Sequence, residues 1–410
     1  MTDTTFSALG LAEPLLRALA ARGHDTPTPI QAQAIPPLVE GRDILAIAQT
    51  GTGKTGAFLL PILHALAAGK RLPASAGPRA LVLAPTRELA IQIGEEAAAY
   101  ARHLRLRHTV IFGGVGYGPQ RKALGQGVDL LIATPGRLID HLGQGTLGLG
   151  SVRHLVLDEA DRMLDMGFVR DVRRILGHVP AERQSLFFSA TMPEAVAGLA
   201  GEILRDPARV EIAPQSTPIE RIEQRVHHVA RGDKLGLLAD VLSDREARRV
   251  IVFTRTKHRA DRVAEALGKR GVPAQAIHGS KSQGARQRAR GAFRAGGCRV
   301  LVATDIAARG IDVDEVSHVV NFELPNEPEA YVHRIGRTAR AGAAGVAISF
   351  CDVEERGYLR DIERLTKARM AVIGEAPPEP VPANDGPKTK PGQGPRRRRP
   401  RRRGQGRAAA

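Results

Sequence analysis

The residues with the clearest chemical signature form a glycine-rich loop, AQTGTGKT, at positions 48–55. The loop follows a short apolar run and precedes a segment with helical periodicity. Glycines in this context let backbone N–H groups curve around phosphate oxygens, and the helix N-terminus adds partial positive charge. The Lys54 amine would reach the β- and γ-phosphates, and the Thr55 hydroxyl would ligate Mg²⁺. The predicted phosphate-binding residues are therefore Ala48, Gln49, Thr50, Gly51, Thr52, Gly53, Lys54 and Thr55.

An acidic pair follows a second apolar run about a hundred residues later. Asp158 and Glu159 come directly after HLVL at 154–157. An acidic pair of this kind usually lies in a solvent-exposed loop. A phosphate-binding loop, however, needs a carboxylate at the end of a neighbouring strand. Asp158 is predicted to hold Mg²⁺, and Glu159 to polarise the attacking water.

Two arginines in the C-terminal part of the chain are spaced so that both side chains could bind the same anion. Arg337 and Arg340 stand three positions apart in HRIGRTAR at 333–340. Side chains at i and i+3 face the same side of a helical turn, so both could converge on a γ-phosphate. An arginine-rich turn is more often a solvated surface, which leaves that alternative open.

These groups are carried by alternating apolar runs and helix-period segments. The alternation predicts α/β architecture with parallel sheets covered by helices on both faces. The pattern weakens in a Pro-, Ser- and Thr-containing stretch and then resumes. We predict two tandem domains at 1–212 and 221–373, a linker at 213–220, and a disordered Arg-, Pro- and Gly-rich tail at 374–410.

Composition points towards a polyanionic partner. The formal net charge is +17, and part of this excess lies in the C-terminal tail. The tail could serve only as a solubilising appendage, but the rest of the chain is also basic. Aromatic residues make up only 3 % of the chain and Trp is missing. We therefore expect contacts to a nucleic-acid backbone rather than base stacking on aromatic platforms.

The sequence gives no sign of membrane insertion or disulfide bonding. No apolar run approaches the roughly 18 residues that a membrane-spanning helix needs. Cys298 and Cys351 are the two cysteines of the chain, which excludes a disulfide framework and a thiolate metal cage. A reducing, cytoplasmic location and a monomer are the default expectations.

Residues 158–161 read Asp-Glu-Ala-Asp, and other motifs follow the same order as in the DEAD-box RNA helicases. The chain resembles that family from about residue 6 to about residue 340. The segment HGSKSQGAR at 278–286 is most similar to the bacterial RhlE-like branch. The resemblance implies two RecA-like domains, ATP and Mg²⁺ as cofactors, and RNA as the partner.

The resemblance also assigns roles to residues around the nucleotide. A Q motif at 4–32 would place Phe6 and Gln31 at adenine, and an amide can present both a donor and an acceptor to that base. His24 stands where the family commonly has an aromatic residue that stacks on adenine. Asp312 would contact the ribose. Arg337 and Arg340 would be arginine fingers, within the motif that begins at His333.

Further motifs are similar to the family's RNA-contacting and coupling segments. Ser189 and Thr191 would couple the ATP state to the RNA site. Each remaining motif alone would more readily be a turn or helix cap. The residues implied in RNA contact are Pro85, Thr86, Arg87, Gly113, Gly114, Thr134, Pro135, Gly136, Arg137, Thr254, Arg255, Gln283, Arg286 and Thr304.

The resulting hypothesis is an ATP-dependent RNA helicase that unwinds short duplexes or remodels RNA–protein complexes without sequence specificity. Ribonucleoprotein partners are possible under this hypothesis. Three alternatives stay open at this point: an ATP-gated RNA clamp, a non-enzymatic RNA-binding protein and a DNA translocase.

Overall fold

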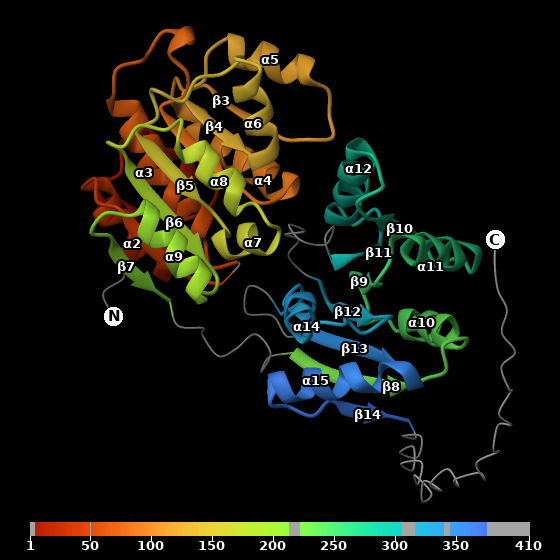
Figure 1. The fold of residues 1–410 in the computed structure, drawn as a ribbon. Coiled ribbons are helices and arrows are strands. Elements are labelled where there is room, and N and C mark those ends of the chain that lie inside the picture. Colours follow the sequence, from red (N-terminus) through yellow and green to blue (C-terminus); the bar gives the residue numbers. More distant parts are fainter. Residues whose placement is uncertain (1–4, 50, 213–221, 306–315, 340–344, 375–410) are drawn as a thin grey trace, which may run out of the picture.

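The computed structural model describes residues 5–49, 51–212, 222–305, 316–339 and 345–374. They form two α/β units, one before and one after the gap at 213–221 (Figure 1). Each unit contains a seven-stranded sheet in which every strand pair is parallel. The predicted fold class of two parallel-sheet domains is confirmed. The predicted linker at 213–220 and all but the first residue of the predicted tail lie outside the described residues.

The first sheet has the strand order β3-β4-β2-β5-β6-β1-β7. Alternate residues of its inner strands face opposite layers, as the pleat requires. In β2, for example, Ala80 and Val82 belong to one apolar cluster and Leu81 and Leu83 to another. The strands are β1 (Ile44–Ile47), β2 (Ala80–Leu83), β3 (His108–Ile111), β4 (Leu130–Ala133), β5 (His154–Leu157), β6 (Gln184–Ser189) and β7 (Ala208–Glu211).

Helices cover both faces of this sheet. The first four pack on one face, where Phe58 meets Phe188 edge to face, and the next five pack on the other. Burial on both sides explains why the inner strands are continuous apolar runs. The helices are α1 (Glu13–Ala20), α2 (Pro29–Val39), α3 (Lys54–Ala68), α4 (Arg87–Tyr100), α5 (Tyr117–Gly125), α6 (Pro135–Gly143), α7 (Ala160–Asp165), α8 (Val169–Leu176) and α9 (Glu194–Ile203). Short 3-10 helices lie at Phe6–Leu9, Ala74–Ala76 and Ala101–His103.

The second sheet has the order β10-β11-β9-β12-β13-β8-β14 and the same layered arrangement. Its strands are β8 (Ile222–His228), β9 (Val250–Phe253), β10 (Ala274–Ile277), β11 (Val300–Ala303), β12 (His318–Asn321), β13 (Gly345–Cys351) and β14 (Ala371–Ile373). Its helices are α10 (Lys234–Ser243), α11 (Lys257–Lys269), α12 (Gln283–Arg294), α14 (Pro328–Ile335) and α15 (Arg356–Thr366), with a 3-10 turn at Val353–Glu355.

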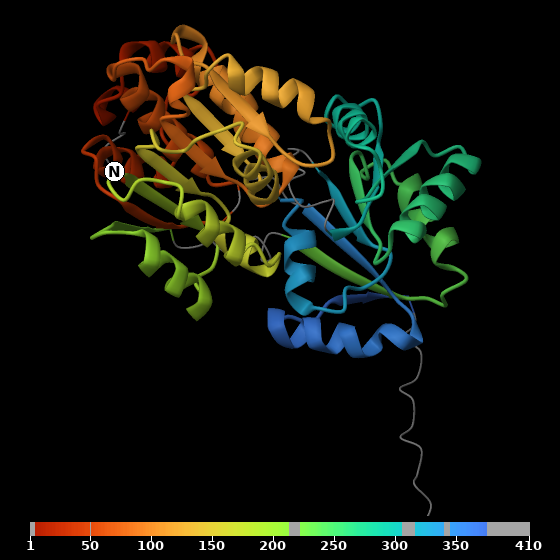
Figure 2. The ribbon, with the colours of Figure 1, turned by 45° about the horizontal axis from the view of Figure 1, so that its top comes forward.

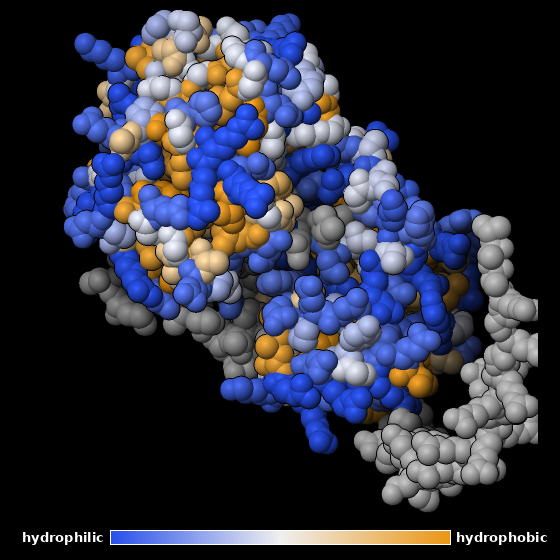
Figure 3. Space-filling model, in the orientation of Figure 1, coloured by the Kyte–Doolittle hydropathy of each residue, from blue (hydrophilic) through white to orange (hydrophobic). Residues whose placement is uncertain are grey.

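The two units meet where α12 of the second approaches α4 of the first. Both ribbon views place α12 on the side of the second unit that faces the first (Figures 1 and 2). The face of the second unit in Figure 3 is largely hydrophilic. Within the described ranges, no helix is long and apolar enough to cross a membrane.

Candidate nucleotide and nucleic-acid site

The glycine-rich loop connects β1 to the first turn of α3. Gly51 and Gly53 have φ values of 84° and 93°, a left-handed backbone that favours glycine. The hydroxyl of Thr52 donates to the carbonyl of Gln49 at 2.8 Å. Lys54 is only 6 % exposed, and its amine donates to the carbonyl of Ala48 at 2.7 Å. The loop is thus held in a curve by its own groups, and the lysine amine lies against the curve where a phosphate would compete for it.

Gln31 is fixed against this loop. Its side-chain oxygen accepts from the backbone N–H of Thr28 at 2.9 Å, and its amide nitrogen donates to the carbonyl of Gly53 at 3.1 Å. A Cβ atom at Gly53 or Gly56 would lie 2.8 or 2.7 Å from that nitrogen. Both glycines therefore provide the room in which the Gln31 amide sits. Phe6 is buried in the core beside this region, whereas His24 is exposed.

Asp158 ends the neighbouring strand as a buried carboxyl group. Burial raises its pKa to about 7, Lys54 opposes that rise, and Glu159 and Asp161 add to it. The backbone N–H of Glu159 also donates to this carboxyl group, at 2.9 Å. A buried carboxyl group with a raised pKa is stabilised in its charged form by a nearby cation. Carboxylate and hydroxyl oxygens are ligands that Mg²⁺ accepts, usually as one or two protein groups completed by phosphate and water. Asp158 and Thr55 therefore fit the metal role that the sequence predicts for them.

Glu159 has an unusual backbone and a fixed side chain. Its φ of 50° is left-handed, a conformation that costs energy for a residue with a Cβ. Its carboxylate lies 2.5 Å from Arg162, and both side chains are 12 % exposed. Arg162 therefore orients the predicted water-polarising group. The sequence motifs did not single it out.

Asp161 joins the acidic motif to the segment predicted to couple the two sites. One of its carboxylate oxygens accepts from the backbone N–H and the hydroxyl of Thr191, each at 2.9 Å, and from the N–H of Ala190 at 3.2 Å. Ser189 donates its hydroxyl proton to the carbonyl of Thr191 at 2.7 Å and accepts from the N–H of Asp161 at 3.3 Å. These hydrogen bonds tie the end of β6 and the two residues after it to the acidic motif. The role of Asp161 was missed, although its letter stands in the motif itself.

The three RNA-contact motifs predicted in the first unit come together at the carboxyl ends of β2, β3 and β4. These strands are neighbours in the sheet, so their following loops share one edge. Arg87 lies against Gly114, whose φ of 79° and lack of a Cβ leave space for the guanidinium group. Arg137 donates to the carbonyl of Val115 at 3.0 Å. Pro85, Thr86, Gly113 and Thr134 belong to these loops, and Pro135 and Gly136 begin α6 directly after Thr134.

Arginines from both units approach one another at this edge. The pKa of Arg87 lies below its ordinary value, first because of burial and then because of the charge of Arg286, with a further contribution from Arg137. Glu88 partly offsets this effect. Arg286 comes from the second unit, and its Nη2 lies 2.7 Å from Glu88 Oε1. Arg87 and Arg286 lie beside the single carboxylate of Glu88, and Arg137 adds positive charge near Arg87, which suits a phosphate backbone.

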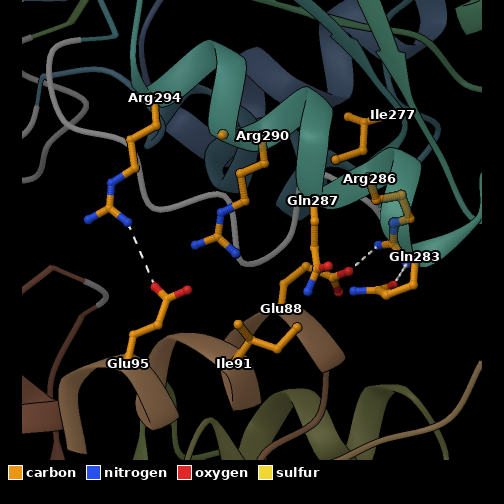
Figure 4. Close-up of a pocket in the computed structure, with 10 residues that line it drawn as sticks. Glu88, Ile91, Glu95, Ile277, Gln283, Arg286, Gln287, Arg290 and Arg294 are labelled. Atoms are coloured by element: carbon orange, nitrogen blue, oxygen red, sulfur yellow. Dashed lines mark hydrogen bonds and ion pairs between the residues drawn. The ribbon is translucent and has the colours of Figure 1, made fainter. Parts of the chain in front are cut away.

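Helices α4 and α12 line the cleft between the units, as Figure 4 shows. Glu88 faces Arg286 at its inner end, and Glu95 faces Arg294 at 3.8 Å at its outer end. Ile91 supplies apolar surface between the two acidic residues of α4. The acids of α4 recur at i and i+7 and the arginines of α12 at i and i+8, so each set lies along one face of its helix.

The other RNA-contact residues predicted in the second unit have partners within it. Arg255 contacts Glu355 at 3.2 Å and the ring of Tyr358 at 5.7 Å. Thr254 is buried, and Gln283 accepts from Arg286 at 3.4 Å. Thr304 is half-buried at the end of β11.

The segment containing His333 is organised around an arginine that the motif analysis left out. Arg334 is 1 % exposed and contacts Asp305 at 2.6 and 2.8 Å. It also donates to Asn321 at 3.1 Å and to the carbonyl of Glu323 at 2.7 Å. Arg337 follows the end of α14 and donates to the carbonyl of His333 at 3.3 Å. Thr50, Asp312 and Arg340, which the sequence also places in the site, lie outside the described residues.

Comparison with family models covers most of both units. Residues 28–199 match the DEAD/DEAH box helicase family, and residues 233–342 match the helicase conserved C-terminal domain. Among curated proteins, the chain is 45 % identical over 367 residues to the DEAD-box ATP-dependent RNA helicase CshA of Geobacillus kaustophilus. That alignment covers 90 % of this chain and 78 % of the relative.

Solved structures show the same two-unit architecture. S. cerevisiae Dbp5 bound to RNA and ADP BeF3 matches with a TM-score of 0.79 at 32 % identity, covering 90 % of this chain and 95 % of that one. A DEAD box protein from Methanococcus jannaschii has higher identity, 37 %, but a TM-score of 0.52, covering 90 % of this chain and 99 % of that one.

Proposed function

The chain belongs to the DEAD/DEAH box helicase family, and from that premise we propose that it is an ATP-dependent RNA helicase with two RecA-like domains. One observation carries the proposal: Arg286 of the second domain lies beside Arg87 and Glu88 of the first. A strand of RNA along these loops would contact both domains at once, so RNA binding and domain approach would favour each other.

The likeness to solved structures supports this arrangement. The RNA- and nucleotide-bound Dbp5 structure matches better than the M. jannaschii protein, although its sequence identity is lower. Because each domain alone has the same fold, such a difference is expected when the placement of the domains differs. The higher TM-score thus supports a domain placement like that of the Dbp5 structure.

ATP hydrolysis is assigned to groups of the first domain. Lys54 would leave the carbonyl of Ala48 and move to the β- and γ-phosphates. Mg²⁺, when bound with ATP, would neutralise developing charge on the phosphates, with Thr55 and Asp158 as its protein ligands. Glu159, held by Arg162, would orient the attacking water and accept its proton.

The second domain would complete the ATP site only when the two domains come together. Arg337 and Arg340 are the proposed arginine fingers, and Asp312 the proposed ribose contact. A finger that arrives on closure can raise the rate by about 10³–10⁵. Hydrolysis would then depend on RNA, and Asp161 would carry the state of the ATP site to Ser189 and Thr191.

Several finer assignments also belong to the proposal. The relative with 45 % identity is named CshA, so the RhlE-like branch expected from HGSKSQGAR is not confirmed. We also propose a cytoplasmic location, a monomeric state and ribonucleoprotein partners. A DNA translocase would be expected to respond equally to DNA.

Strand separation tests the proposal against the ATP-gated clamp. A short RNA duplex with a single-stranded extension would be incubated with enzyme and either ATP or a non-hydrolysable analogue, and release of the labelled strand followed. Release in both conditions, with repeated turnover only with ATP, is expected of the helicase. Tight RNA binding without strand release in either condition would support the clamp. Glu159→Gln is the matched control, because it retains the fold and removes the proton acceptor.

A further inference from the structure

Tyr117 lies among the predicted RNA loops, although no motif includes it. It begins α5, directly after the loop that contains Gly113 and Gly114. The guanidinium carbon of Arg137 lies 4.1 Å from the centre of its ring. Its hydroxyl donates to Asp140 at 2.9 Å, and the ring of His141 approaches edge-on at 5.5 Å. Groups from α5 and α6 therefore fix the tyrosine ring in one place.

Arg137 depends on that ring. Its side chain is 6 % exposed, and the carboxylate of Asp140 is 3.8 Å away, beyond hydrogen-bonding distance. Nη2 donates to the carbonyl of Val115, whereas Nε and Nη1 are buried without a hydrogen-bond partner among the residues described. A buried cation with so few partners is costly. The negative face of an aromatic ring supplies the missing compensation.

The contact between Arg137 and Tyr117 involves both the loop after β3 and the start of α6. Arg137 belongs to the Thr134–Arg137 segment, and the carbonyl it binds belongs to Val115, next to Gly114. Gln120 of α5 holds the beginning of the same loop by donating to the carbonyl of Phe112 at 3.0 Å. The stack of Arg137 on Tyr117 therefore ties the loop after β3 to the first turn of α6, which follows β4.

We propose that Tyr117 is a positioning residue for RNA binding, which acts by holding Arg137 and, through it, the spacing between the loop after β3 and the start of α6. The inference rests on the proposed function. Backbone N–H groups of glycine-containing loops can bind successive phosphates only when the loops keep a fixed separation. Tyr117 supplies that rigidity without itself contacting the RNA.

The experiment compares Tyr117→Phe with Tyr117→Leu. Affinity for a labelled single-stranded RNA is measured by fluorescence anisotropy with a non-hydrolysable ATP analogue, and RNA-stimulated ATPase gives KM for RNA and kcat. We expect Tyr117→Leu to weaken RNA affinity about five- to tenfold, as the loss of one desolvated cation–π contact implies. Its kcat at saturating RNA should stay within about twofold of the wild type. Tyr117→Phe keeps the ring and should restore affinity to within about twofold.

A double-mutant cycle separates positioning from direct base stacking. If Tyr117 acts through Arg137, Tyr117→Leu has no further effect in an Arg137→Met background. If it stacks on a base, the two losses add, and the inference is overturned. Unchanged affinity of Tyr117→Leu would also overturn it. Thermal unfolding and nucleotide affinity of each variant show whether the first domain is intact. Wild-type protein that hydrolyses ATP without any response to RNA would refute the proposed function instead.

Discussion

Arg286 of the second domain lies 2.7 Å from Glu88 of the first, and the two side chains are only 8 % and 7 % exposed. The sequence predicts Arg286 as an RNA contact, and the structure adds a carboxylate of the opposite domain as its partner. Glu88 adjoins Arg87 in the chain, so this ion pair links the RNA loops of the first domain to the position of the second. The ion pair can therefore stabilise the arrangement in which the two domains are in contact.

Exchanging these two charges tests whether they act on each other. Glu88→Arg or Arg286→Glu alone places like charges together at a buried position, and we expect RNA affinity with an ATP analogue to fall about tenfold or more. The double exchange restores opposite charges and should recover most of the affinity, as measured by anisotropy. A double variant as weak as Arg286→Glu alone would show that the pairing with Glu88 makes no contribution to RNA affinity.

The outer pair of the cleft should contribute much less. Glu95 and Arg294 are 3.8 Å apart and mostly exposed, so solvent and salt screen them. Arg294→Glu is expected to weaken RNA affinity about twofold at low salt, with no difference from wild type at about 0.5 M salt. A large loss that persists at high salt would contradict this assignment.

Gly56→Ala tests whether the position of the Gln31 amide beside the phosphate loop matters for nucleotide binding. The added Cβ would lie 2.7 Å from the Gln31 amide nitrogen, which must then move. Loss of about one hydrogen bond to adenine should reduce ATP affinity about tenfold and lower the preference for ATP over GTP. Gly198→Ala is the matched control, because its Cβ meets nothing within 4 Å in α9 and should stabilise the protein by about 0.5–1 kcal/mol. Equal nucleotide affinity in both variants would contradict a role for Gln31 at the base.

The core of the second domain contains a charge cluster whose disruption should reduce stability. Lys234 is 1 % exposed and pairs with Glu355 and, at 3.2 Å, with Asp352. Lys234→Met would leave the carboxylates of Glu355 and Asp352 without the ammonium group between them. We expect the free energy of unfolding to fall by about 3 kcal/mol. Adding Glu355→Gln should recover part of that loss. Chemical denaturation measures both, and an unchanged midpoint for Lys234→Met would contradict the account.

The inner strands could be predicted from sequence because burial on both faces makes them continuous apolar runs. The edge strands β3, β7 and β14 are hard to predict for the converse reason. β7 reads ARVE with only Val210 buried, and all three residues of β14 are exposed. An edge strand needs little apolar sequence, since its backbone pairing is supplied by the neighbouring strand.

The site shows the same division between local and distant information. The phosphate loop and the acidic motif are contiguous in sequence, so spacing alone identified Lys54 and Asp158. Arg334 and Tyr117 escaped because their partners lie elsewhere in the chain. Arg334 contacts Asp305, 29 residues away, and Tyr117 contacts Arg137 only through the packing of α5 on α6. No local pattern marks such pairs before the fold brings them together.

Whether RNA gates ATP hydrolysis is measured by steady-state ATPase assays with no nucleic acid, with single-stranded RNA and with DNA of matched sequence. For an RNA-gated motor we expect slow hydrolysis without nucleic acid and stimulation on the order of tenfold or more by RNA. We also expect little stimulation by DNA and none in Lys54→Ala. Equal stimulation by DNA, or a rate that does not respond to RNA, would contradict an RNA-gated motor.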